Sequence, residues 1–79
     1  MAKVDIYHYG SATDVDTVTL SNCDSTNTAD YAVWINQEQD SLPGTYVIKP
    51  HAISGSTMTL KSGGAITKCH LITVIQKGA

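Results

Sequence analysis

The sequence predicts one all-β domain over residues 1–79, folded as an antiparallel β-sandwich or a small barrel of about six to seven strands. Val, Ile and Thr supply 23 of the 79 residues, and β-branched side chains suit a pleated sheet better than a helix. Apolar and polar residues alternate in several short stretches, and turn residues separate these stretches at the spacing typical of sandwiches and barrels. A chain of this length forms a single domain.

The first two predicted strands are alternating segments. Residues 2–9 alternate between an apolar and a polar face, which predicts a half-buried strand. Residues 10–14 are rich in turn-forming side chains and are predicted to form a turn. In residues 15–23 the alternation places Val18 and Leu20 on the inward face, with threonine and serine outward.

The middle of the chain contains two further predicted strands. Residues 24–30 form a polar loop, because short oxygen-bearing side chains bond the local backbone in place of a ladder. Residues 31–36 are the third strand. Residues 42–44, Leu-Pro-Gly, predict a turn. Residues 45–49 are the fourth strand, which ends at Pro50 because proline cannot donate to a ladder.

The last third of the chain supplies the remaining strands. Residues 56–61 predict a strand with Met58 and Leu60 inward. Ser-Gly-Gly at residues 62–64 predicts a tight hairpin turn, since glycine adopts positive φ at little cost. Residues 65–76 form the last strand, which is the longest apolar, β-branched run in the sequence.

That last strand is apolar on both faces. Leu71 and Ile75 share one face, whereas Ile72 and Val74 share the other. A strand of this kind has to be covered on both sides, so it is a central strand or an interface strand. We therefore expect one pair to close the core and the other to meet a neighbouring protein. Alternation alone does not decide which, and all four residues remain candidate interface residues.

The two cysteines flank the single tryptophan in the order Cys23, Trp34, Cys69. This order resembles the immunoglobulin domains, in which a disulfide joins the two sheets beside a buried tryptophan. The resemblance implies an immunoglobulin-like sandwich with a candidate Cys23–Cys69 disulfide. The alternation of the second strand instead turns Cys23 outward, which favours the alternative of two reduced thiols.

Motifs for catalysis and for ligand binding are missing from the sequence. There is no C-x-x-C or H-x-x-x-H spacing, no P-loop and no G-x-S-x-G. We therefore expect no enzymatic activity, no catalytic residue, no metal and no cofactor. A chain this short is also expected to lack a pocket of about 300 Å³ or more, the size that small-molecule sites use.

Composition disfavours two classes of partner. Arginine is absent, the five lysines are scattered and the net charge is −2, whereas nucleic-acid binding needs a clustered basic face. No apolar run approaches the roughly 20 residues of a membrane helix, and the first residues do not read as a secretion leader. We expect synthesis in the cytoplasm, with neither a nucleic-acid nor a membrane partner.

Carbohydrate binding is the alternative that the aromatic residues suggest. Trp34 could stack on a sugar ring, with Asn27, Asn36 and Asp30 as polar partners. A tryptophan between Val33 and Ile35 in a strand more often belongs to the core, and on that interpretation Trp34 is buried.

The overall make-up resembles the small β-sandwich accessory proteins of tailed bacteriophage virions, the cement or decoration proteins. The chain is short and rich in Thr, Ser, Gly and Ala, as in Val18-Thr19-Leu20-Ser21-Asn22 and in the stretch from Ser56 to Gly64. The resemblance implies a non-enzymatic protein of the virion that binds assembled capsid subunits and stabilises the shell. The expected partners are capsid subunits or further copies of the chain, in a homo-oligomer or a larger assembly. The alternative is an immunoglobulin-like binding module, with carbohydrate as its candidate ligand.

Overall fold

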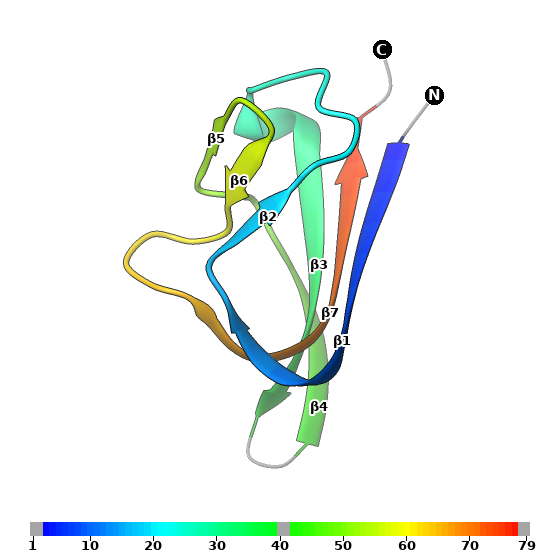
Figure 1. Ribbon diagram of the computed structural model, residues 1–79, viewed down its shortest axis with the longest axis vertical. Helices are drawn as coiled ribbons and strands as arrows, with labels where there is room; N and C mark the ends of the chain where they lie inside the picture. The colour runs from blue at the N-terminus through cyan, green and yellow to red at the C-terminus, as the bar shows by residue number, and fades with distance from the viewer. Residues whose placement is uncertain (1–2, 40–41, 78–79) are drawn as a thin grey trace.

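A computed structural model describes residues 3–39 and 42–77, and these residues form two antiparallel sheets (Figure 1). One turn of 3-10 helix, η1 (Thr28–Asp30), precedes the third strand. The strands are β1 (Lys3–Val15), β2 (Thr17–Thr19), β3 (Tyr31–Gln39), β4 (Leu42–Ile48), β5 (Ala52–Ser54), β6 (Thr57–Thr59) and β7 (Ile66–Gln76). The prediction of an all-β, sandwich-like domain is confirmed.

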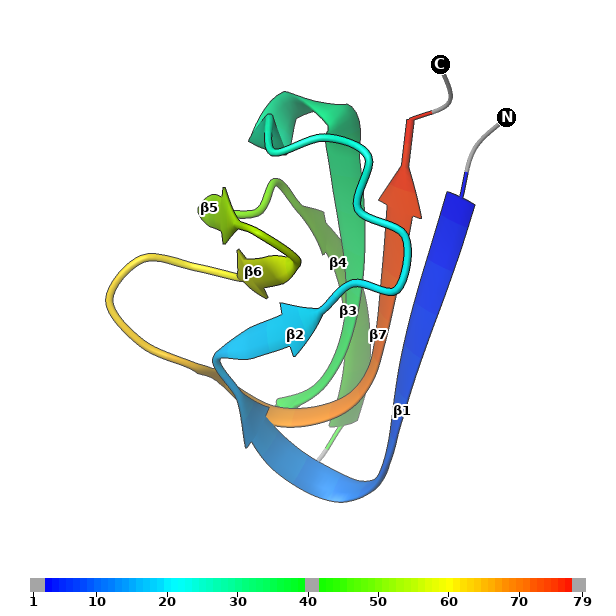
Figure 2. The same cartoon turned by 45° about the horizontal axis from the view of Figure 1, so that its top comes forward.

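The larger sheet has the strand order β1-β7-β3-β4, and the smaller sheet has the order β2-β6-β5. Figure 2 shows the three short strands as a second layer over one face of the larger sheet. In the larger sheet β7 lies between β1 and β3, where Ile75 pairs with Val4 on one side and with Ala32 on the other. The last strand is therefore central, as its apolar faces predict.

The core lies between the two sheets. Val33 and Ile35 of β3 are fully buried, because alternate residues of this strand face the smaller sheet. The predicted inward residues Val18 and Leu20, as well as Met58 and Leu60, are all buried. Among the residues whose burial the structure describes, the buried apolar ones are Val15, Val18, Leu20, Tyr31, Val33, Ile35, Met58, Leu60, Ile66, Cys69, Ile72 and Val74.

Strand β1 continues through the turn predicted at residues 10–14. Its regular pairing with β7 stops at His8, opposite Leu71, and resumes at Thr13, opposite Cys69. This irregularity is a bulged corner, and such bulges bend a strand. The strand curls away from the larger sheet here and leads into β2 of the smaller one (Figure 2).

Two other predicted turns differ from the structure. The turn predicted at residues 42–44 is wrong, because these residues open β4, with Leu42 paired to Gln39. Residues 62–64 do turn, with φ of 81° at Gly63 and 147° at Gly64. They do not close a hairpin, because β6 and β7 belong to different sheets. Strand β5 was not predicted.

A bulge in β7 sets the orientation of Cys69. Asn36 pairs with Leu71 but the next β3 residue, Gln37, pairs with Cys69, so His70 is the extra residue. The bulge therefore shifts the alternation of inward and outward side chains by one position. As a result Cys69 points into the core, on the same side of the sheet as Ile72.

Candidate functional site

The face of the larger sheet that points away from the smaller sheet is the candidate functional site, and we call it the outer face. Its side chains form three rows across the strands, since directly paired residues point to the same side. The middle row is Ile6, Thr73, Trp34 and Val47. The flanking rows are Val4, Ile75 and Ala32 on one side, and His8, Leu71, Asn36 and Thr45 on the other.

The outer face exposes several large apolar side chains next to one another. The exposed fraction is 66% for Ile6, 53% for Val4, 48% for Val47 and 44% for Trp34. Single exposed apolar residues are normal on a protein surface. A contiguous apolar group without a charged residue among these rows is instead typical of an interaction site.

Strand β1 exposes its apolar side chains because its polar ones are bound on the inner side. Asp5 accepts a hydrogen bond from Ser21, and the Tyr7 hydroxyl donates to the carbonyl of Thr19 at 2.5 Å. Lys3 forms an ion pair with Asp24. These partners are the last residue of β2, Thr19, and two residues of the segment that follows it. That segment covers the polar face of β1, which leaves Val4 and Ile6 pointing outward.

These contacts also change the acidity of the groups involved. The hydrogen bond from Lys3, followed by that from Gln76, lowers the pKa of the Asp24 carboxyl below its usual value. Burial, with a smaller effect from the Asp5 charge, raises the pKa of Tyr7 to about 12. Both shifts favour the protonation states in which these contacts form at neutral pH.

A shallow depression of about 330 Å³ lies within the outer face. The Asn36 side-chain amide donates to the Thr45 hydroxyl across it at 3.3 Å, so part of its polar capacity is already used. The surface of the depression that a ligand could contact is therefore mainly apolar. The lining residues are Trp34, Asn36, Thr45, Leu71, Thr73 and Ile75.

The structure separates the four candidate interface residues of the last strand into two pairs. Ile72 and Val74 are 0% and 1% exposed and face the smaller sheet. Leu71 and Ile75 are partly exposed and lie on the outer face. The core-facing pair cannot contact a partner while the domain is folded, so only Leu71 and Ile75 remain as candidates.

Most residues of the outer face are not predictable from the sequence pattern. The prediction that Trp34 is buried in the core is wrong. Val33 and Ile35 occupy the inward face of β3, so Trp34 points outward. That opposition was visible in the sequence and places Trp34 on the outside. No comparable pattern placed Ile6 on the outside. The polar side chains of β1 point inward because they bind residues 19–24, and the alternation of β1 does not reveal these partners.

Both cysteines are free thiols, so the candidate disulfide between Cys23 and Cys69 is not formed. Cys23 is partly buried, and its thiol lies 3.3 Å from the carbonyls of Ser25 and Gly55. Cys69 is fully buried, and burial raises the pKa of its thiol. The alternative of two reduced thiols describes this structure.

The acidic side chains of the polar loop at residues 24–30 make internal contacts. In the polar loop Asp24 binds Lys3, and Asp30 accepts a hydrogen bond from the Ser25 hydroxyl at 2.7 Å. Over residues 3–39 and 42–77, no group of three or more His, Cys, Asp or Glu side chains is placed to bind a metal ion. Within the same residues, no helix combines the length and apolar character needed to cross a membrane.

Comparisons with known proteins give no relative of this chain. No protein-family model, no curated protein and no solved structure matches it.

Proposed function

We propose that this protein is a non-enzymatic structural protein that binds other protein subunits through its outer face. Its expected setting is the virion of a tailed bacteriophage, where it decorates and stabilises the assembled capsid. The exposed, uncharged middle row of the outer face, from Ile6 to Val47, carries this proposal. An exposed, largely apolar centre without charged residues matches the anatomy of protein interfaces, whose centres are depleted in charge.

The size of the outer face favours a repetitive partner. Four strands spaced about 4.8 Å apart and three rows about 7 Å apart span roughly 400 Å². A typical stable interface buries about 800 Å² on each partner, so one copy on this face alone binds weakly. A shell offers many equivalent sites, and a ligand that binds only the assembled state stabilises it at every occupied site. Modest affinity for each copy is sufficient for such a role.

Co-sedimentation with capsids tests the proposal. Purified shells from the phage whose genome carries the gene, stripped of this protein, are mixed with the wild type and with Ile6→Glu. We expect the wild type to sediment with the shells and Ile6→Glu to remain in the supernatant, because the variant places a charge at the centre of the contact. Ile6 is 66% exposed, so the variant should fold with a stability within about 0.5 kcal/mol of wild type.

The matched control is Thr57→Glu, which adds the same charge to an exposed strand position in the smaller sheet. It should sediment like the wild type. Equal sedimentation of Ile6→Glu and Thr57→Glu would contradict docking through the outer face. Wild-type protein that does not bind the shells at all would contradict the decoration role.

Carbohydrate binding is the second candidate, because Trp34 is 44% exposed beside the shallow depression. An exposed tryptophan face next to the amide of Asn36 can stack on a sugar ring. Two variants distinguish this function from protein docking. Trp34→Ala should abolish a glycan-array signal, whereas Ile6→Glu should preserve it, since Ile6 does not line the depression. No array signal from the wild type would contradict this alternative.

A further inference from the structure

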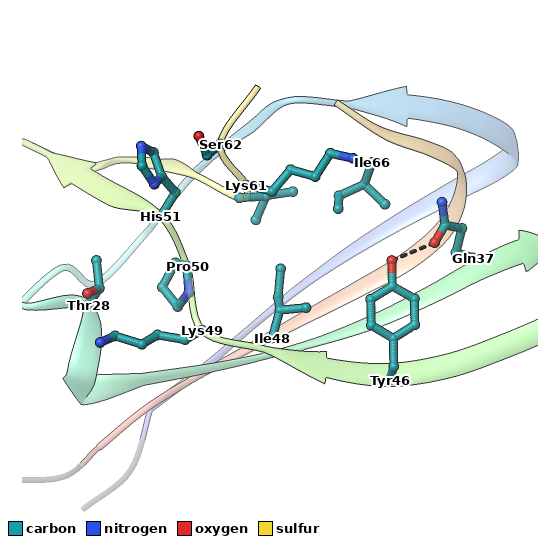
Figure 3. A pocket seen from close by; sticks show the side chains of 11 residues that line it. Thr28, Gln37, Tyr46, Ile48, Lys49, Pro50, His51, Lys61, Ser62 and Ile66 are labelled. Carbon is teal, nitrogen blue, oxygen red and sulfur yellow. Dashed lines mark hydrogen bonds between the residues drawn. The ribbon is translucent and has the colours of Figure 1, made fainter. Parts of the chain in front are cut away.

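A second cavity, separate from the outer face, opens between the two sheets beside β4 (Figure 3). Its volume is about 560 Å³, which contradicts the expectation that so short a chain lacks a pocket of small-molecule size. Five of its eleven lining residues come from two connections between the sheets, residues 49–51 and residues 61–62. The lining residues are Thr28, Gln37, Tyr46, Ile48, Lys49, Pro50, His51, Leu60, Lys61, Ser62 and Ile66.

The cavity exists because the two sheets differ in size. The strands of the smaller sheet are three residues long, whereas β4 runs from Leu42 to Ile48. The inward side chains of β4, Tyr46 and Ile48, are therefore left partly uncovered. The Tyr46 hydroxyl donates to the Gln37 side chain at 2.5 Å and closes one end of the cavity (Figure 3).

The floor of the cavity is apolar. Leu60 and Ile66 are 1% and 3% exposed, and Ile48 packs against the same core. Pro50 is buried alongside them. A ligand that entered the cavity would therefore meet aliphatic side chains at the bottom, which favour an apolar group.

The rim of the cavity is basic. Lys49 and His51 lie on one connecting segment, and Lys61 lies on the facing one (Figure 3). The hydroxyls of Thr28 and Ser62 add hydrogen-bond donors. Among the described residues that line the cavity none is acidic, although the chain as a whole carries a net charge of −2. Cationic groups around a low-dielectric cleft raise the local concentration of anions.

We propose that this cavity binds an organic anion with an apolar body, of the class of a medium-chain carboxylate. The aliphatic floor formed by Ile48, Leu60 and Ile66 takes the apolar body. The ammonium groups of Lys49 and Lys61 extend toward opposite sides of the cavity (Figure 3), so they attract the charged end through the positive potential of the rim. The hydroxyls of Thr28 and Ser62 are available as hydrogen-bond donors. This site uses no residue of the outer face, so it is independent of the proposed capsid contact.

Titration with sodium octanoate, followed by amide chemical shifts, tests the proposal. We expect saturable binding of one octanoate per chain, with the largest shifts at Ile48, Leu60 and Ile66. Lys49→Gln and Lys61→Gln should each weaken binding by up to about fivefold, as expected for one partly screened charge contact. Raising the ionic strength should weaken wild-type binding as well. Both lysines are exposed, so the variants should fold normally.

The controls separate charge recognition from simple apolar binding. Lys77→Gln removes a lysine that does not line this cavity. This variant should bind octanoate with the same affinity as the wild type. Octanol, which has the same chain without the charge, should bind more weakly than octanoate. The proposal is overturned if octanol binds as tightly as octanoate, if Lys49→Gln and Lys61→Gln bind like the wild type, or if the shifts centre on Trp34 and Leu71 of the outer face.

Discussion

At the scale of single residues, Gln76 and Tyr31 form a buried polar network at one end of the larger sheet. The Tyr31 hydroxyl donates to the Ser25 carbonyl at 2.7 Å and lies 3.0 Å from the Gln76 side-chain oxygen. Gln76 is 6% exposed, and its amide donates to Asp24 at 3.1 Å. Because Asp24 also binds Lys3, the network joins the start of β1 to the end of β7. Buried polar groups of this kind require complete pairing.

The same network predicts a loss of stability at alkaline pH. Burial is the main cause that raises the pKa of Tyr31, and also that of Tyr7, to about 12. In the unfolded chain these hydroxyls ionise near pH 10. Between pH 10 and pH 12 the unfolded state therefore binds fewer protons than the folded state, so the free energy of unfolding decreases as the pH rises. The stabilisation is fully present below pH 10.

Urea unfolding followed by circular dichroism at pH 8, 10 and 11 measures this effect. We expect a lower midpoint at pH 11 than at pH 8, with the tyrosine contribution to the decrease falling mainly between pH 10 and pH 11. The double variant Tyr7→Phe/Tyr31→Phe is the control. It should be less stable at pH 8, because buried partners lose a hydrogen bond, and should lose less stability between pH 10 and 11. A wild-type midpoint that is equal at pH 8 and 11 would disprove the proposed cause.

At the scale of elements, β1 and β7 have opposite relations to the core. Strand β7 is apolar on both faces and lies in the middle of its sheet, where β1 and β3 cover its edges. Strand β1 lies at the edge and turns a polar side inward, toward the segment after β2. The apolar residues of β1 thus extend the outer side of β7, from Ile75 to Val4 and from Thr73 to Ile6. The two strands together make half of the outer face.

Two substitutions in β7 distinguish its two faces. Ile72→Asp buries an unpaired carboxylate in the core, and we expect it to cost about 4 kcal/mol or more and to unfold the domain. Ile75→Asp places the same carboxylate on the outer face, where water reaches it, and we expect a folded protein that no longer binds capsids. Thermal melts followed by circular dichroism measure both stabilities. If both variants unfold, the face that carries Ile75 is not available to a partner in the folded domain.

At the scale of the whole molecule, the all-β class, the central last strand and most of the core follow from the sequence. Alternation identified Val18 and Met58 as inward because a strand has only two faces. Alternation cannot tell which face is inward when the covering segment is distant in sequence, and β1 is such a case, since its inner face meets residues 19–24. The basic cavity was also missed, because its Lys49 and Lys61 come from two separate connections between the sheets.

The whole-molecule consequence of weak binding at many sites is a concentration-dependent stabilisation of the shell. A ligand at a free concentration 100 times its Kd adds about 2.7 kcal/mol for each occupied site. We therefore expect the dissociation temperature of stripped shells to increase with the concentration of wild-type protein, as light scattering during heating would show. Ile6→Glu should need about thirtyfold more protein for the same increase, because an unpaired charge in the contact costs about 2 kcal/mol. Thr57→Glu should match the wild type. An equal increase with Ile6→Glu would place the contact elsewhere on the molecule, and no increase with the wild type would remove the stabilising role altogether.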